Sequence, residues 1–377
     1  MRMDCTNSVI DNRIAWIDNA KMIAMLFVIL GHTSRIIHCP MPEWLNMFIL
    51  AFNMPLFVVL SGYTQFKALQ RLRNLQDLIN YIYKLTCRML VPAIVFTYTL
   101  RFIDTFSAGG NFFKMVILET IGLSYCLLYL IRDKYSLCSS LFKIACWIAI
   151  PLAMIKSNYW FFNMLWAVSV TMGIAKYLCD CMRIRQWSLF ITCVLSIPLA
   201  FLMNIFHDKT TDFIAFFWLG ILLYRINFFE KIDYWWSIIL FFVLGNLSLS
   251  HFGIETFNFW DYHPLYYLLR SEISVFMYRI LTSSLLCLSL LILIKKLSNS
   301  YSNFSKCGTY TLPIYLIHSV FITVFYNSNI HIQLGSLDYM MYALVCTYIL
   351  CIASLLLVKL SNKYSLTRAF VLGKIVL

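Results

Sequence analysis

The sequence predicts an all-α membrane protein: a polytopic bundle of about 10–12 transmembrane helices with both chain ends in the cytoplasm, forming a single transmembrane domain over residues 1–377. Composition is the first reason, because 61% of the residues are hydrophobic and only 12% are charged, whereas a soluble domain has about 25% charged residues. A mean hydropathy of +0.76 is the second. The aromatic share of 17% is the third, since Trp and Tyr gather at membrane interfaces.

Apolar runs near the spanning length of about 20 residues recur along the whole chain. The candidate spans are roughly 14–37, 45–65, 83–103, 111–131, 140–156, 159–178, 187–205, 211–226, 235–250, 272–295, 309–327 and 337–360. Between the second and third runs, residues 66–80 are predicted to form an interfacial helix that carries Lys67, Arg71 and Arg73. A polar loop over residues 251–271 is predicted on the outer side.

The basic residues orient the bundle. With the N-terminus inside, about three quarters of the 30 Lys and Arg residues fall on the cytoplasmic side, and Arg279 is among the few assigned to the outer side. This asymmetry indicates an even number of spans. The net charge of +13 does not indicate nucleic-acid binding, because the basic residues are spread between apolar runs. The cysteines show no metal-ligand spacing, so no metal site is predicted.

The first two runs contain polar residues that lipid would reject. Asp18, Lys21 and His32 lie in the first run, and Asn53 and Ser61 lie in the second. A charge at mid-depth costs about 2.5–3.5 kcal/mol on insertion scales, so such groups usually face the bundle interior, a cavity or a substrate path. The hairpin of these two runs is therefore the primary candidate for a functional site.

Helical spacing places Lys21 and His32 on one face. They are eleven residues apart, which is three turns plus about 20°, and about 16 Å along the axis. This geometry suits a long ligand whose anionic head meets Lys21 while His32 acts on its far end as a general base. The alternative is a Lys21 that snorkels to the interface beside Asp18 and a His32 that is hydrogen-bonded inside the bundle.

Four further residues are candidates for substrate binding. Lys84 and Arg88, spaced i,i+4 at the inner end of the third run, either bind a phosphate-rich ligand or anchor lipid headgroups. His318 either lines the cavity and contacts the acceptor or is a satisfied bundle histidine. Ser61 either lines the same cavity or lies at a helix crossing with Gly62.

Asn53 is a further candidate for the cavity lining, and Pro55, two residues on, bends the second helix. Glu119, in the fourth run, is an intramembrane carboxylate with no partner that the sequence identifies.

These residues resemble the acyltransferase-3 family of integral-membrane O-acyltransferases, including its fucose 4-O-acetylase-like group. The likeness rests on separated motifs of the first three runs: Ile17-Asp18-Asn19-Ala20-Lys21 leading to Leu30-Gly31-His32, Met54-Pro55-Leu56-Phe57 followed by Ser61-Gly62-Tyr63, and Arg88 with Pro92. Phe217-Trp218-Leu219-Gly220 and Tyr315-Leu316-Ile317-His318 match weaker late features. Two features depart from the family pattern: Asn53 stands where many members have His, and twelve runs exceed the usual ten-helix core.

The resemblance implies transfer of an acyl group, usually acetyl from acetyl-CoA, to a hydroxyl of a glycan or glycolipid at a bacterial inner membrane. Acetyl-CoA would be a donor substrate, with no bound cofactor. His32 would be catalytic, Lys21, Lys84 and Arg88 would bind the donor, and Ser61 would shape the site. Two alternatives remain from the residues alone: a transporter or flippase for a glycolipid or small polar solute, and a non-catalytic membrane scaffold.

Overall fold

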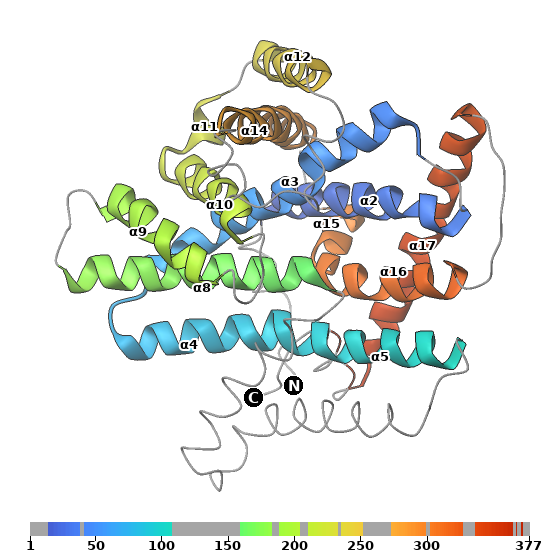
Figure 1. Ribbon diagram of the computed structural model, residues 1–377, viewed down its shortest axis with the longest axis horizontal. Coiled ribbons are helices and arrows are strands. Elements are labelled where there is room, and N and C mark those ends of the chain that lie inside the picture. The colour runs from blue at the N-terminus through green and yellow to red at the C-terminus, as the bar shows by residue number, and fades with distance from the viewer. Residues whose placement is uncertain are drawn as a thin grey trace, which may run out of the picture.

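The computed structural model describes residues 14–37, 41–107, 159–182, 188–203, 210–232, 235–251, 273–298, 302–326 and 336–364, together with 367 and 371. Every regular element in these ranges is a helix (Figure 1). The elements are α2 (Ala15–Ile37), α3 (Glu43–Leu69), α4 (Leu75–Leu85), η1 (Thr86–Leu90), α5 (Val91–Ser107), α8 (Trp160–Cys181), α9 (Ser188–Met203), α10 (Thr210–Arg225), α11 (Phe228–Lys231), α12 (Trp235–His251), α14 (Ile273–Leu297), α15 (Asn303–Gly308), α16 (Thr311–Tyr326) and α17 (Ser336–Ser361).

Within the described ranges, six stretches of helix are long and apolar enough to cross a membrane: Ala15–Ser34, Glu43–Leu69, Leu75–Arg101, Trp160–Cys181, Ser274–Leu297 and Asp338–Ser361. Shorter apolar helices occupy Leu189–Met203, Trp235–Ser250 and Thr311–Tyr326. The predicted all-α membrane architecture is therefore confirmed. The candidate spans 111–131 and 140–156, Glu119 and almost all of the outer loop lie outside the described residues, so the total number of spans stays a prediction.

The predicted interfacial helix over residues 66–80 is wrong. Helix α3 continues to Leu69, a turn follows, and α4 begins at Leu75. Asn74 caps α4, because its side chain accepts a hydrogen bond from the backbone N–H of Asp77 at 2.8 Å. The cap starts a new helix in the middle of the polar segment, and that helix runs on into the third span.

Helices α3 and α10 cross with their backbones in contact. A Cβ added at Gly62 would collide with the carbonyl of Phe217, and one added at Gly220 would collide with the carbonyl of Val59. Each helix thus supplies a glycine where the other helix's main chain passes, as small residues do at close helix crossings. The crossing fixes the position of Ser61, the residue before Gly62, in the C-terminal half of α3.

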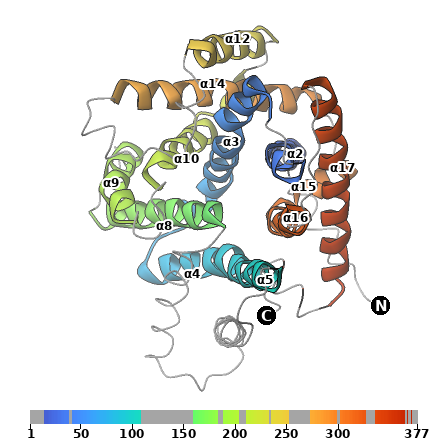
Figure 2. The same ribbon diagram turned by 45° about the vertical axis from the view of Figure 1, so that its right-hand side comes forward.

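Helices α2 and α16 lie side by side. Figure 2 shows them nearly end-on, with α3 on one side and α17 on the other. Gly308, at the end of α15, packs directly on the backbone of Asp18. Ser305 donates a hydrogen bond to Asn19 at 2.7 Å, and Asn19 donates to Ser298 at 2.7 Å. These contacts hold the beginnings of α2 and α16 at the same level, so both helices run in the same direction through the bundle.

A buried ion pair joins α10 and α14. Asp212 and Arg279 are 3.5 Å apart, and their side chains are 0% and 1% exposed. The sequence assigned Arg279 to the outer side of the membrane, which stays a prediction; the structure shows that its side chain is buried against a carboxylate. Removal of either partner of a buried pair would leave the other charge buried and uncompensated.

Candidate active site

A cavity of about 550 Å³ lies at the end of the bundle where α2 begins and α3 ends. Its other walls come from α4, η1 and the α15–α16 turn. The cavity brings together five of the eight residues that the sequence nominated, which are Asp18, Lys21, Ser61, Lys84 and Arg88. They come from three segments of the chain, so their convergence is a property of the fold and not of sequence proximity.

The cavity mouth is rich in positive charge. Lys21, Lys67, Lys84 and Arg88 all line it, together with the carboxylate of Asp18. The Lys21 ammonium lies 3.4 Å from Asp18, and the two side chains are 26% and 8% exposed. Lys84 and Arg88 are exposed at the mouth. An anionic ligand would meet exposed cations at the entrance and the half-buried Lys21, partly neutralised by Asp18, beside them.

A π-helical turn, η1 (Thr86–Leu90), begins two residues after Lys84 and includes Arg88. Its first residue, Thr86, accepts a hydrogen bond from the indole of Trp166 at 3.1 Å and donates one to the carbonyl of Ile82 at 2.9 Å. A π turn takes more residues per turn than an α-helix, and such insertions are frequent at functional sites. Lys84, two residues before the turn, and Arg88, within it, both line the cavity.

Polar side chains on α3 and α4 also line the cavity, and hydrogen bonds tie them to α8. Tyr81 donates a hydrogen bond to the amide oxygen of Gln65 at 2.6 Å, and the Gln65 amide donates to Ser169 at 3.1 Å. Ser169 in turn donates to the carbonyl of Leu165 at 2.8 Å. Gln65 and Tyr81 border the cavity, and this chain of hydrogen bonds fixes their orientation.

The two intramembrane histidines lie together. The ring of His32 on α2 and the ring of His318 on α16 have centroids 5.6 Å apart and planes tilted by 35°. His32 is half-buried, and His318 is 1% exposed. The Tyr315 ring lies one helical turn before His318, at 5.3 Å. Neither histidine is in the lining of the cavity, so the structure separates the nominated residues into a charged mouth and an imidazole pair.

The hydrogen bond of His318 defines its tautomer. Its Nδ1 lies 3.1 Å from the carbonyl oxygen of Ile314. A carbonyl can only accept, so Nδ1 carries the hydrogen and Nε2 presents a lone pair. Nε2 is buried and has no hydrogen-bond partner among the described residues. A buried acceptor without a partner is costly, which points to a ligand group that fills this position.

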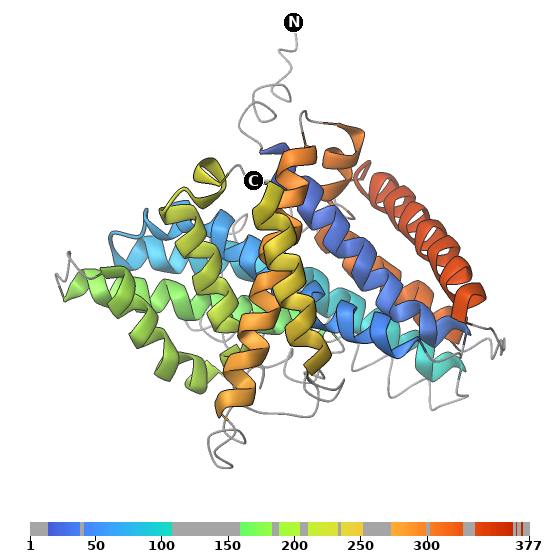
Figure 3. The same ribbon diagram turned by 90° about the horizontal axis from the view of Figure 1, so that it is seen from above.

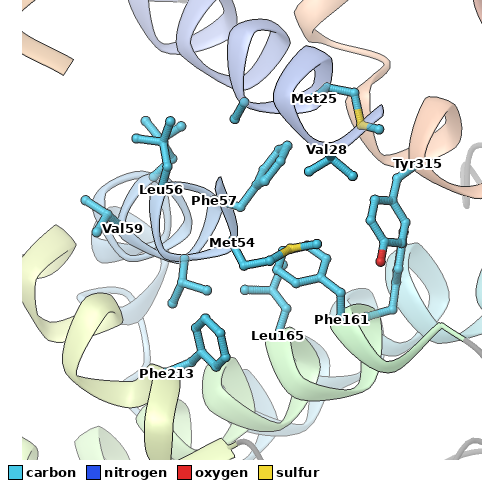
Figure 4. Close-up of a cluster of buried hydrophobic side chains, with 14 of the residues drawn as sticks. Met25, Val28, Met54, Leu56, Phe57, Val59, Phe161, Leu165, Phe213 and Tyr315 are labelled. Atoms are coloured by element: carbon cyan, nitrogen blue, oxygen red, sulfur yellow. The ribbon is translucent and has the colours of Figure 1, made fainter. Parts of the chain in front are cut away.

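Apolar side chains occupy the space between the mouth and the imidazole pair. Figure 4 shows Met25 and Val28 of α2 near Tyr315 of α16, with Phe57 of α3 and Leu165 of α8 in the same cluster. Phe57 and Leu165 also border the deep end of the cavity. Met25 and Val28 are 0% and 1% exposed.

One face of α2, called here the stripe, therefore carries Lys21, Met25, Val28 and His32, which follow one another at spacings of four, three and four residues. Asn53 is buried at 7% exposure, its side-chain oxygen accepts from the backbone N–H of Met54 at 2.6 Å, and it does not line the cavity.

Residues 14–358 match the family model of the acyltransferase-3 type, described as an acyltransferase domain. The chain belongs to the acyltransferase-3 family. The match covers nearly all of the described helices, so the charged mouth and the imidazole pair are parts of a multi-pass membrane acyltransferase, which requires an acyl donor and an acceptor. No curated protein and no solved structure matches the chain. The fucose 4-O-acetylase-like subgroup stays a prediction.

Several residues around this acyltransferase site were not predicted from the sequence. Gln65 and Tyr81 carry no charge and stand in segments that look like ordinary helix, and Trp166 resembles any aromatic residue of a span. Asp212 and Arg279 did carry a signal, because each is a charge inside an apolar run. Their pairing required the packing of α10 on α14, which no local pattern in the sequence gives.

Proposed function

We propose that this acyltransferase moves an acetyl group from acetyl-CoA to a hydroxyl of a glycan or glycolipid, and that the whole chain acts as one transmembrane domain. The observation that carries the proposal is the convergence of Lys21, Lys84 and Arg88 on one cavity at the beginning of the helix that bears His32. Coenzyme A has a phosphorylated nucleotide head and a long, thin arm that ends in the thioester. A cationic mouth that ends at an apolar cluster, with the imidazole pair beyond it, supports a ligand of that shape.

The donor head would lie in the mouth. Arg88 can bind a phosphate through two parallel N–H groups, whereas Lys21 and Lys84 act as point charges. The charge asymmetry of the chain supports a mouth on the cytoplasmic side, where acetyl-CoA is made, and the membrane we propose is a bacterial inner membrane. The arm would run past Met25 and Val28 toward the histidines, over the distance of about 16 Å that eleven helical residues span.

In the proposed reaction, His32 takes the proton of the acceptor hydroxyl as that oxygen attacks the thioester carbonyl carbon. A carbon–oxygen bond forms, the carbon–sulfur bond breaks, and the coenzyme A thiolate leaves with the electron pair and is then protonated. The apolar surroundings limit hydrolysis of the thioester by excluding water. Ser61, at the deep side of the mouth, would contact the arm.

His318 would bind the acceptor. Its Nε2 lone pair is fixed by the Nδ1–H bond to Ile314 and lies beside the ring of His32. A sugar presents neighbouring hydroxyls, so one hydroxyl can donate to His32 while the next donates to His318. His318 then sets which hydroxyl reacts, and His32 performs the proton transfer.

Transfer of labelled acetyl from acetyl-CoA to glycans, in membranes with and without the protein, tests the proposal. Label should appear with the wild type and with Ser34→Ala, a control on α2 two residues away from the stripe, and should disappear with His32→Ala. Equal labelling with His32→Ala would refute its catalytic role. A transporter or flippase would instead move a glycolipid or solute across the membrane with no transfer of label.

A further inference from the structure

We propose that a second cavity, between α11, α12 and α14, binds the phosphate of an anionic phospholipid. This cavity has a volume of about 330 Å³. Its lining consists of Phe229, Ile232, Trp235, Ile292, Lys295 and Lys296. None of these residues lines the acyl-donor cavity, so the proposal is independent of the acetyl-transfer mechanism.

The two lysines concentrate positive charge in this cavity. The Lys295 ammonium donates to the backbone carbonyl of Phe229, which uses one of its three N–H groups. The Lys296 ammonium lies over the ring of Trp235, 5.0 Å from the centroid. Neighbouring residues of a helix point about 100° apart, so Lys295 and Lys296 would not meet by helix geometry alone. The hydrogen bond of Lys295 to α11 and the contact of Lys296 with Trp235 of α12 direct both ammonium groups to the same cavity. Two adjacent ammonium groups attract phosphate oxygens.

The surroundings select an occupant that has a hydrocarbon tail. The cavity lies at the first residue of α12, the outermost helix in Figure 1, which runs beside α14 in Figure 3. Apolar residues of α12 face outward: Trp236 is 78% exposed, Ile239 52% and Leu240 55%. In a membrane this surface contacts acyl chains. A lipid can place its chains on α12 and its phosphate at Lys295 and Lys296, whereas free phosphate would leave that apolar surface unused.

Charge then discriminates between lipids. The headgroup of a zwitterionic phospholipid would bring its own ammonium close to the two lysines, whereas an anionic headgroup brings none. The lysines follow the last apolar turn of α14, at the end where the positive-inside pattern puts the cytoplasmic leaflet. Anionic lipids are the matching partner at that leaflet.

The back wall of the cavity is preformed. Phe229 is 3% exposed, and its ring lies 4.8 Å from the ring of Trp16 and 5.7 Å from that of Tyr63. These contacts anchor α11 to α2 and α3. Binding therefore needs little rearrangement of the protein, and most of the interaction energy remains available for affinity.

The test is native mass spectrometry of the full-length protein with phosphatidylglycerol and with phosphatidylcholine. It compares the double variant Lys295→Gln/Lys296→Gln with the control Lys359→Gln/Lys363→Gln, which removes two exposed lysines from the end of α17. Each basic residue near an anionic surface contributes about a factor of five in affinity, so we expect the double variant to bind phosphatidylglycerol about 30-fold more weakly. The control should bind it like the wild type.

Three results would overturn the proposal: equal losses in the two double variants, equal binding of phosphatidylcholine by the wild type, or protection against thermal unfolding by inorganic phosphate alone. The single variant Lys296→Gln keeps the hydrogen bond of Lys295 to α11, so it should fold even if the double variant does not. Its affinity for phosphatidylglycerol should fall about fivefold. An unchanged melting temperature in neutral detergent shows that either variant is folded.

Discussion

Replacement of Arg88 by alanine should weaken binding of the acyl donor without abolishing the reaction. Arg88 lines the mouth of the proposed donor cavity in η1, whereas His32 and His318 lie on α2 and α16. The side chain is exposed, so its removal leaves no void in the bundle. The change therefore isolates electrostatic recognition of phosphate from folding and from proton transfer.

The magnitude follows from the type of contact. A hydrogen bond to a charged group contributes about 1.5–3 kcal/mol. Because Arg88 is exposed, water and salt reduce its contribution toward the lower figure, which corresponds to a Kd for coenzyme A about tenfold higher. Arg88→Lys keeps the charge but loses the parallel pair of N–H groups, so its Kd should lie between those of the wild type and the alanine variant.

Calorimetric titration of coenzyme A into the protein in nanodiscs, at low and at physiological salt, measures this effect. Arg71→Ala is the matched control, because Arg71 is exposed in the turn between α3 and α4 and does not line the cavity. We expect the Arg71 variant to bind like the wild type and the difference from Arg88→Ala to shrink as salt rises. Equal Kd values for the two variants would refute the assignment of the donor head to this mouth.

Three more predictions concern the deeper site and the bundle. His318→Ala should raise the acceptor KM in steady-state kinetics about 3- to 10-fold, which corresponds to the loss of one neutral hydrogen bond, while the donor Kd stays constant. His318→Gln, whose amide oxygen can accept in place of Nε2, should restore much of the lost acceptor binding. A raised donor Kd would contradict this role. Asp212→Asn should destabilise the fold by about 3–5 kcal/mol, because it leaves the Arg279 charge buried without its carboxylate, and thermal unfolding in detergent would show it; an unchanged melting temperature would contradict the ion pair. Gly220→Ala should cost about 1–3 kcal/mol through overpacking against α3, also read from the melting temperature, with Gly245→Ala as a milder case because the nearest atoms there are a flexible Leu286 side chain.

The membrane class and most helices could be predicted because they depend on local hydrophobicity. The stripe from Lys21 to His32 could be predicted as well, because the period of a helix fixes which residues share a face. The boundary between α3 and α4 was misplaced, since a single cap at Asn74 decided it and the flanking polar residues obscured that signal.

The approach of His318 to His32 could not be predicted by spacing. His32 and His318 are 286 positions apart in the sequence. Their meeting depends on contacts at the beginnings of α2 and α16. The backbone contact of Gly308 with Asp18 sets that alignment. The π turn at Arg88 was not predicted either, because no local pattern in the sequence marks it; in the structure its first residue accepts a hydrogen bond from Trp166 on another span.

Helices α2 and α16 run in the same direction from a common level, an arrangement that would let the proposed donor mouth and the proposed acceptor site share one path. Asp18 on α2 meets Gly308, and Thr311 on α16 lines the same mouth as Lys21. From that level His32 is eleven residues beyond Lys21, and His318 is seven beyond Thr311, or about 16 and 10 Å along the two axes. The two imidazoles thus reach one place from the same side, beyond the apolar cluster that contains Met25 and Val28. Because methionine adapts its shape readily, Met25 is the side chain best able to give way to a thin donor arm while the packed bundle keeps water out.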